Sequence, residues 1–264
     1  MGLIINIIKE GYAKDTVRHL RAALSSLLTD ALEDEIIEIN PALQVTNRKW
    51  KTADKKNQAE FEESVRPMSA EQFAAFCEAA QETKEHEFGP FFIFLGKTGL
   101  RPSAAIALLP SDIDERKRKV SVNKVYLINS GWLRPFTKTG VARTVDLSSE
   151  LCGLLGHHRT YLHDNLARRR EEAFRHGKPV PKTPEMLFPN RAGEYIDWNN
   201  AVDAFHRLCG KAKIGRFRPY ALRHTFATIL LAEGAPITYV AIQLPNVALP
   251  WAGCAASALL SGFR

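Results

Sequence analysis

Residues Arg216–Gly234 read RFRPYALRHTFATILLAEG, and this stretch decides where the chain can be placed. Pro219 precedes apolar residues at helical spacing, and proline favours a helix start because its missing N–H would find no partner in the first turn. Gly234 is a natural C-terminal stop. Tyr220 and Arg223 lie three residues apart, so they share a face near the N-terminus, where exposed N–H groups favour an anion. The stretch predicts a helix with one phosphate-facing side.

The composition fits an anionic partner, although a single arginine at a helix start is more often only a solvated charge. The 264 residues carry a formal net charge of +7, which favours a polyanion. The apolar content of 45% is ordinary for a globular protein. No apolar run approaches the roughly 20 residues of a membrane span. The opening MGLIINIIKEG is too short for a signal peptide. We therefore expect a cytoplasmic protein that binds no membrane.

The cysteines are far apart and form no CxxC pair. They are Cys77, Cys152, Cys209 and Cys254. This pattern favours reduced thiols used as small apolar residues over a structural zinc site. The nearest approach to a metal cluster combines Cys152 with His157, His158 and His163 on a helix-like segment. Because a second cysteine is missing there, we expect these histidines to face solvent and to bind no metal.

Two regions of unequal size are expected. Residues 12–34 show apolar residues at helical spacing until Asn40-Pro41 breaks the pattern, so residues 1–45 form a small helical region that is incomplete as a domain. Residues 46–66 are polar and basic, as in an exposed linker that either follows a phosphate backbone or is simply solvated. Residues 67–264 form the main domain.

The main domain begins with helices. Ser69 is the expected cap of a helix through Glu78 or beyond, and the nearly continuous apolar run Phe88–Thr98 predicts a buried helix. Gly99 permits a tight turn, Arg101 directly precedes a new helix, and Pro110-Ser111-Asp112 ends that helix. Further helices are expected over residues 149–176 and 197–209.

Between these helices the pattern changes to alternation, which predicts strands. One strand is expected over Val120–Ile128, a second over Trp132–Phe136 and a third over Val141–Leu147, where Arg143 alternates with apolar residues. Lys138 lies in the turn TKTG between the second and the third. A lysine at such a tip is ordinarily a soluble turn residue and gains a role only if the tip reaches an active site. The expected fold class is mainly α with a small antiparallel β-sheet.

Three motifs occur in order along the chain: TGLRPSAAIALLPSDID at 98–114, FTKTGVARTVDL at 136–147 and RPYALRHTFATILLAEG at 218–234. In this order they resemble the tyrosine recombinase family, also called phage integrases, over most of Ser69–Gln243. Residues 12–45 resemble, more weakly, the latter half of that family's core-binding domain. The resemblance implies a catalytic domain over residues 67–264 and a partial helical core-binding domain over residues 1–45. It also implies a DNA-binding protein of a mobile element.

The resemblance assigns roles to individual residues. It makes Arg101 and Arg223 the two catalytic arginines and Lys138 the hairpin lysine. Attack on a phosphodiester gathers negative charge on the non-bridging oxygens, and two planar guanidinium groups hold those oxygens without a metal or cofactor. The lysine can donate a proton to the leaving 5′ oxygen. A tyrosine nucleophile stores the bond energy as a 3′-phosphotyrosine, so strands are rejoined without ATP. The implied partner is double-stranded DNA, on which family members act as homo-oligomers.

Two positions of the expected site depart from the family pattern. Tyr220 stands where the family usually has histidine, and it keeps a hydroxyl for hydrogen bonding but not the same acid–base behaviour. Ala104 stands where the family commonly has an acidic residue, so support for Arg101 is weaker. The expected site is therefore Arg101, Lys138, Tyr220 and Arg223.

A larger departure follows Gln243. Family members continue with Leu-Gly-His and, a short helix later, the nucleophilic tyrosine. This chain has Pro245 and Asn246 in place of the Gly-His pair and no tyrosine after Tyr239, which precedes the expected histidine position. Packing or capping is therefore the expected role of Tyr239.

We expect a chain truncated at both ends relative to the family, with an atypical C-terminus from about residue 245. The hypothesis is that a frameshift or a recombination scar replaced the native segment. Translating the encoding DNA in the other two frames tests it. If neither frame contains Gly-His and a downstream tyrosine, the hypothesis is wrong.

Three functions stay open. The first is an enzyme of DNA strand exchange, either competent in an intact relative or completed by a partner's tyrosine in trans. For this function we expect no covalent DNA adduct from this chain alone. The second is a non-catalytic DNA-binding remnant of an integrase. The third is a product that folds poorly, against which a cooperative thermal melt would argue. A type IB topoisomerase shares the general chemistry but not the short arrangement of motifs.

Overall fold

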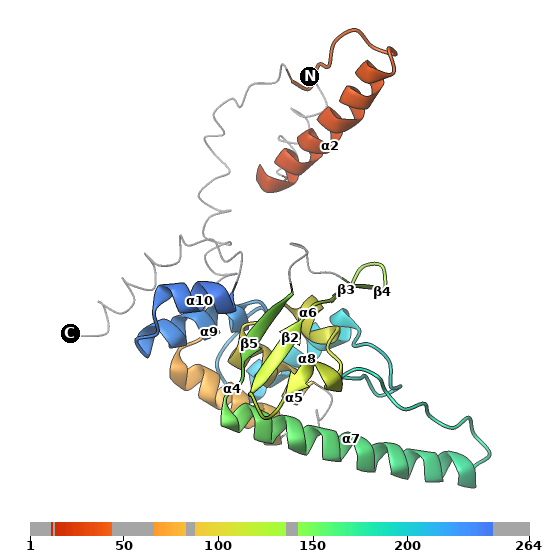
Figure 1. Ribbon diagram of the computed structural model, residues 1–264, viewed down its shortest axis with the longest axis vertical. Helices are drawn as coiled ribbons and strands as arrows, with labels where there is room; N and C mark the ends of the chain where they lie inside the picture. The colour runs from red at the N-terminus through yellow and green to blue at the C-terminus, as the bar shows by residue number, and fades with distance from the viewer. Residues whose placement is uncertain (1–11, 13, 44–65, 83–87, 136–141, 245–264) are drawn as a thin grey trace. The chain divides into compact units, whose positions relative to one another are not determined.

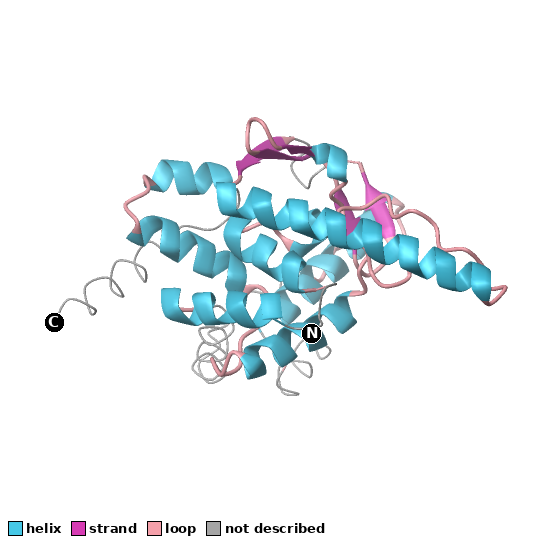
Figure 2. Ribbon diagram, turned by 90° about the horizontal axis from the view of Figure 1, so that it is seen from below, coloured by secondary structure: helices cyan, strands magenta, loops and turns pink. Residues whose placement is uncertain are grey.

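The computed structural model is mainly helical with short antiparallel strands, as the sequence predicts, and these strands form two small sheets where one was expected (Figures 1 and 2). It divides into two compact units, residues 1–64 and 65–264. The residues it describes are 12, 14–43, 66–82, 88–135 and 142–244. Four segments considered above lie outside them: the apolar start, most of the basic linker, the TKTG turn with Lys138, and residues 245–264.

The first unit contains the helix that the apolar spacing predicts, α2 (Lys14–Glu33). Asn40 fixes the chain that follows it. The Asn40 Oδ1 accepts the N–H of Ala42 at 2.9 Å, and its Nδ2 donates to the Ser25 carbonyl and the Thr29 hydroxyl, both at 2.9 Å. Because these bonds satisfy its buried amide, Asn40 ties the segment after α2 back onto the helix.

The second unit contains every helix that the sequence predicts for it. Its elements are α4 (Ala70–Glu82), α5 (Gly89–Thr98), α6 (Pro102–Ile106), the 3-10 turn η1 (Pro110–Asp112), β1 (Ile113–Asp114), β2 (Lys119–Val122), β3 (Val125–Leu127), β4 (Trp132–Arg134), β5 (Arg143–Asp146), α7 (Ser149–Arg175), α8 (Trp198–Lys211), α9 (Ala221–Ala232) and α10 (Ile237–Gln243). Ser69 caps α4 as expected. Its hydroxyl accepts the N–H of Gln72, and the Gln72 side chain accepts the N–H of Ser69.

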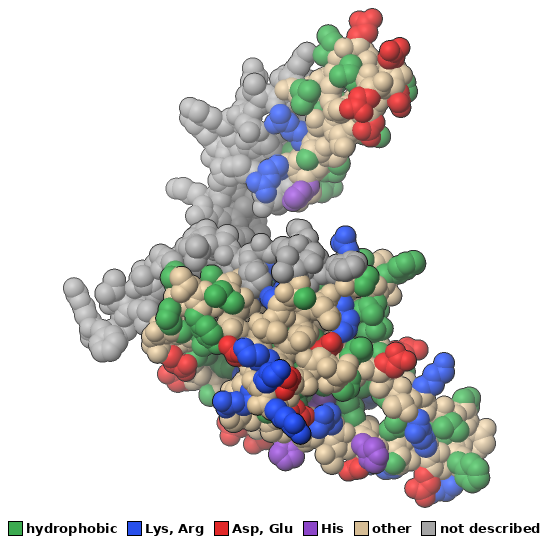
Figure 3. Space-filling view, viewed as in Figure 1, with side chains coloured by type: hydrophobic (Ala, Val, Ile, Leu, Met, Phe, Trp, Pro, Cys, Tyr) green, Lys and Arg blue, Asp and Glu red, His purple; other side chains and the backbone are tan. Residues whose placement is uncertain are grey.

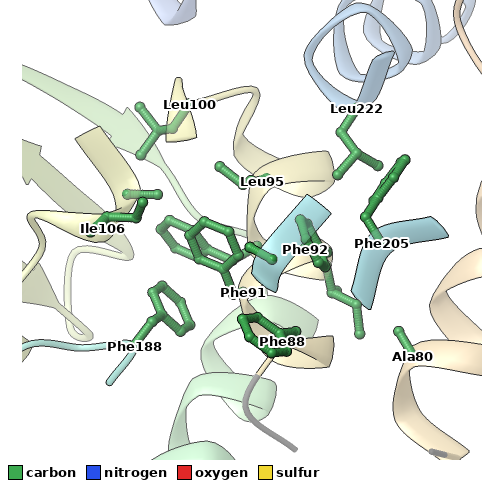
Figure 4. Packing of buried hydrophobic residues seen from close by; sticks show 14 of the residues in the cluster. Ala80, Phe88, Phe91, Phe92, Leu95, Leu100, Ile106, Phe188, Phe205 and Leu222 are labelled. Atoms are coloured by element: carbon green, nitrogen blue, oxygen red, sulfur yellow. The ribbon is translucent and has the colours of Figure 1, made fainter. Parts of the chain in front are cut away.

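A phenylalanine-rich core holds these helices together, and α5 lies inside it (Figure 4). Phe91 and Phe92 of α5 are fully buried. The ring of Phe92 lies 5.1 Å from that of Phe205 on α8, and the ring of Phe91 lies 5.6 Å from that of Phe188, both nearly edge-on. Leu222 brings α9 into the same core. The α9 helix is thereby fixed against α5, which positions the candidate site at their ends.

The strands form two sheets, so the prediction of one continuous strand over Val120–Ile128 is wrong. The chain leaves β2 after Val122 and enters the separate β3–β4 hairpin at Val125. At this break the Lys124 ammonium contacts both carboxylate oxygens of Asp112, at 2.7 and 2.8 Å. The half-buried ion pair holds the chain at the point where it changes sheets.

The third predicted strand is present as β5 and pairs with β2, in the sheet order β1-β2-β5. The register places Val145 opposite Val120 and Arg143 opposite Val122. All three valines are fully buried. Since side chains alternate along a strand, Arg143 faces the same side as Val145, toward the core.

His158 corrects the expectation of solvent-facing histidines. Its side chain is buried, its Nε2 bonds the Leu187 carbonyl at 3.1 Å, and its ring lies 5.4 Å from that of Phe188. Burial lowers the pKa of His158 to about 4, against a smaller opposing effect of the hydrogen bond. His158 is thus a neutral core residue, whereas His157 and His163 are exposed as expected.

The remaining sequence expectations concern thiols, metals and membranes. Three cysteines are free thiols in the structure: Cys77, Cys152 and Cys209. Among the described residues, no group of histidine, cysteine and acidic side chains is arranged to hold a metal ion. No helix in the described ranges is long and apolar enough to cross a membrane.

Candidate functional site

Arg223 lies at the centre of the candidate site. It occupies the first turn of α9 and is only 2% exposed, a rare position for a guanidinium group. Its Nη1 donates to the Gly99 carbonyl at 2.5 Å, and its side chain also hydrogen-bonds Tyr220. Burial lowers the pKa of Arg223 to about 10, and the positive charge of Arg101 lowers it as well. Arg223 therefore remains a cation at neutral pH, held rigidly by its partners.

The turn between α5 and α6 brings Gly99 and Arg101 to this site. Gly99 ends α5 in the left-handed region, with φ 62° and ψ 14°, and its N–H donates to the Leu95 carbonyl at 2.8 Å. A Cβ at Gly99 would lie 2.5 Å from the side chains of both Phe226 and Leu244. Arg101 then adopts an extended backbone conformation as the N-cap residue of α6. One tight turn thus sets both the carbonyl that holds Arg223 and the starting point of the Arg101 side chain.

The residues after Arg223 fix the start of α9. The Thr225 hydroxyl accepts the N–H of Met68 at 2.9 Å, which ties α9 to the chain ahead of α4. His224 is buried, and its ring lies edge-on to that of Tyr220 at 5.1 Å. Burial and the charge of Arg223 lower the pKa of His224 to about 4, so the imidazole is neutral at neutral pH. The helix start therefore carries one fixed cation.

Tyr220 and Arg223 share one side of α9 as the sequence predicts, but the backbone N–H groups do not contribute as expected. The N–H groups of residues 221–223 donate to the carbonyls of residues 218–220 at 2.9–3.2 Å, so they are not free to bind an anion. Tyr220 is 41% exposed, and its side chain is accessible. The attraction for an anion at this helix start comes from side chains.

A third arginine, Arg143 of β5, acts electrostatically on this region, and no role was predicted for it from the sequence. Burial, and to a smaller extent the charge of Arg101, lowers the pKa of Arg143. Besides burial, the charges of Arg101 and Arg143 lower the pKa of Arg223. Among the described residues, neither Arg101 nor Arg143 forms an ion pair with a carboxylate. An arginine at an inward-facing strand position is the signal that could have identified it.

The remaining sequence candidates lie in different places. Lys138 is outside the described residues, so its position near the site stays a prediction. Ala104 is buried in α6 and offers no acidic partner to Arg101. The Tyr239 hydroxyl on α10 donates to the Asp146 carboxylate at 3.0 Å. This contact agrees with the packing role expected of Tyr239.

Basic side chains on the outer surface differ from the arginines of the candidate site, because they lie among acidic side chains. Figure 3 shows lysines and arginines gathered over the β1-β2-β5 sheet and the start of α7, with acidic side chains among them. Lys119 lies 2.9 Å from Asp146, and Arg159 lies 2.9 Å from Glu115. In these exposed pairs a nearby carboxylate balances the positive charge. Among the described residues, Arg101 and Arg143 have no such carboxylate partner.

The fold and the site together define a class of protein. The chain is mainly helical and brings several arginine side chains together, as proteins that hold phosphate groups do. The chain belongs to the phage integrase family, whose family model matches residues 63–244. The expected resemblance to the tyrosine recombinases is thereby confirmed.

Curated relatives agree with this assignment. The chain is 26% identical over 251 residues to a tyrosine recombinase XerC-like protein of Caldanaerobacter subterraneus subsp. tengcongensis, covering 89% of this chain and 60% of the relative. It is 28% identical over 250 residues to prophage integrase IntR of Escherichia coli K12, covering 89% and 55%. The chain thus spans less than two thirds of the length of these relatives.

Among solved structures, the Tn1549 transposon integrase in complex with a circular intermediate DNA is similar. The TM-score is 0.68 at 18% sequence identity, over 98% of this chain and 82% of that one. This likeness shows a shared fold.

Proposed function

We propose that this chain binds double-stranded DNA and holds a backbone phosphate at Arg101 and Arg223. The reaction it serves is site-specific recombination and integration, by strand breakage and rejoining through a 3′-phosphotyrosine. The observation that carries the proposal is the convergence of arginine side chains around the buried Arg223, without carboxylate partners for Arg101 among the described residues. Cations placed together repel one another, and an anionic phosphate relieves that repulsion.

The proposed roles follow from how each residue is held. Arg223 is fixed by the Gly99 carbonyl and by Tyr220, so its guanidinium does not reorganise when charge develops on the phosphate oxygens. Arg101 approaches from the start of α6 and supplies a second planar fork. Tyr220 replaces the family's histidine as a hydrogen-bonding group. Lys138 is the proposed proton donor to the leaving 5′ oxygen.

In this proposal the nucleophile is assigned to no tyrosine within residues 1–264. Residues 240–264 contain no tyrosine, and the Tyr239 hydroxyl is bonded to Asp146. We expect a tyrosine supplied in trans by a partner subunit to complete the reaction. The second candidate function, favoured by the same observation, is a non-catalytic module that occupies DNA without cutting it.

The proposed domain organisation follows the family. Residues 67–264 form the catalytic domain and residues 1–45 part of a core-binding domain, joined by a basic linker over residues 46–66. The linker adds phosphate contacts that do not depend on sequence. A cytoplasmic location and assembly on DNA as a homo-oligomer are part of the same proposal, because the proposed substrate is DNA.

The salt dependence of DNA binding tests the proposal. Fluorescence anisotropy with a labelled duplex should show affinity falling steeply between 50 and 200 mM salt, with a log–log slope of about −0.9 per phosphate contact. Arg101→Ala should reduce the magnitude of that slope by about 0.9. The control is Arg175→Ala, since Arg175 is exposed and paired with Glu171 at the far end of α7. Equal slopes for wild type and Arg101→Ala would contradict the proposal.

A covalent-adduct assay separates the two candidate functions. A nicked duplex that traps the intermediate is incubated with the chain alone and with a tyrosine-bearing family member whose two arginines are replaced. An adduct that forms only in the mixture supports the enzyme completed in trans. Its absence, with DNA binding intact, supports the non-catalytic module.

A further inference from the structure

We propose that Arg143 is a third phosphate-contacting arginine, which binds a non-bridging oxygen of the same DNA phosphate as Arg101 and Arg223. The inference rests on the proposed function and deepens it. It concerns a residue on a strand, whereas the two expected arginines lie at helix starts.

The strand geometry aims Arg143 inward. On β5, Val145 is fully buried while Thr144 is exposed, so the two sides of the strand differ sharply. Arg143 shares the side of Val145 and pairs across the sheet with the fully buried Val122. If the guanidinium group needed only solvation, an arginine would be more favourable at the exposed position of Thr144. The sheet instead directs this charge toward the interior, where it requires a partner.

The structure gives Arg143 no such partner within the described residues. Its Nε is buried and makes no hydrogen bond there, and its guanidinium forms no ion pair with a carboxylate in those ranges. The nearby charge that acts on it is that of Arg101, which has the same sign. Burial and repulsion both lower the pKa of Arg143, and a bound anion would offset both effects.

The chemistry of phosphoryl transfer suits a third donor. Each non-bridging oxygen accepts more than one hydrogen bond, and the negative charge on these oxygens grows in the transition state. The family's usual acidic residue near Arg101 is replaced by the buried Ala104, so no carboxylate at that position offsets the clustered positive charge. Arg143 adds a fork whose Nε–H is already desolvated, which strengthens its bond to an oxyanion.

Arginine side-chain NMR tests the contact directly. In protein labelled with ¹⁵N-arginine, the Nε–H peaks of Arg143 and Arg101 are assigned by their loss in Arg143→Lys and Arg101→Lys. Inorganic phosphate should shift both peaks saturably, whereas sodium chloride at equal ionic strength should shift neither. If the Arg101 peak moves and the Arg143 peak does not, the inference is overturned while the proposed function stands. If neither moves, both fail.

A charge-relocation variant distinguishes position from net charge. Arg143→Ala should reduce the magnitude of the salt slope for duplex binding by about 0.9, and Arg143→Lys should retain it. The double variant Arg143→Ala with Thr144→Arg restores the net charge on the opposite side of the strand, and its slope should stay reduced. Recovery of the slope in the double variant would show that position does not matter and would overturn the inference. Thermal melts confirm that each variant is folded.

Discussion

Replacing Gly99 by alanine tests how the site is built, because this residue combines two constraints. Its φ of 62° lies in the left-handed region, and a Cβ there would lie 2.5 Å from the side chains of Phe226 and Leu244. Its carbonyl holds Arg223 at 2.5 Å. Any shift that makes room for the methyl group therefore moves the partner of the central cation.

The expected cost has two parts. Holding alanine in the left-handed region costs about 1 kcal/mol, and forcing a methyl group into packed side chains costs about 1–3 kcal/mol more. The sum of roughly 2–4 kcal/mol corresponds to a fall in melting temperature of about 10 °C for a unit of this size. DNA affinity should fall as well, since Arg223 loses its fixed position.

Gly177 provides a matched control for the backbone term. Its φ is 61°, but nothing lies within 4 Å of a Cβ placed there. Gly177→Ala should therefore cost only about 1 kcal/mol and leave DNA binding unchanged. Thermal melts and anisotropy of both variants give the comparison. Equal destabilisation by the two substitutions would refute the packing argument, and unchanged DNA binding by a folded Gly99→Ala would refute the link to Arg223.

Two further predictions concern the pH dependence of stability and the contact that holds α10 against β5. His158 has a folded pKa of about 4 against about 6.5 when unfolded, so the unfolded chain binds the extra proton and stability falls as pH drops from 6.5 toward 4. The fall between pH 7 and pH 5 should be about 2 kcal/mol from this residue, and urea unfolding of His158→Gln should show a correspondingly smaller fall, whereas an unchanged fall would contradict the assignment. Asp146→Ala should speed amide exchange over residues 237–244, because the carboxylate binds α10. Asp114→Ala, whose carboxylate bonds within its own turn, should leave that exchange unchanged, and equal exchange in both variants would argue against the contact.

Local patterns account for the helices. Ser69 and Gln72 carry the capping chemistry of α4 in their own side chains, and Gly234 ends the region after α9 with a positive φ as expected. The order of the three motifs carries the resemblance to the family, and that resemblance predicts the fold. The positions of Arg101 and Arg223 at the starts of α6 and α9 follow from the same local signals.

Long-range contacts account for what the sequence left out. The alternating pattern around Val120 gives no sign that the strand ends after Val122. The ion pair at that point joins Lys124 to Asp112, twelve positions away in the sequence. His158 looks like an exposed helix residue until the chain around Leu187 covers it. Arg143 alternates with valines, yet only the folded sheet brings it within range of the charge of Arg101. None of these partners lies within the sequence window that predicted the element.

A crystal structure of the protein with tungstate tests whether Arg101 and Arg223 hold a phosphate. Tungstate is a tetrahedral oxyanion whose tungsten is located by anomalous scattering. We expect a tungsten peak for a tungstate whose oxygens are in hydrogen-bond contact with the guanidinium groups of Arg101 and Arg223. Anomalous peaks confined to other basic surfaces, with both arginines in contact only with water, would contradict it.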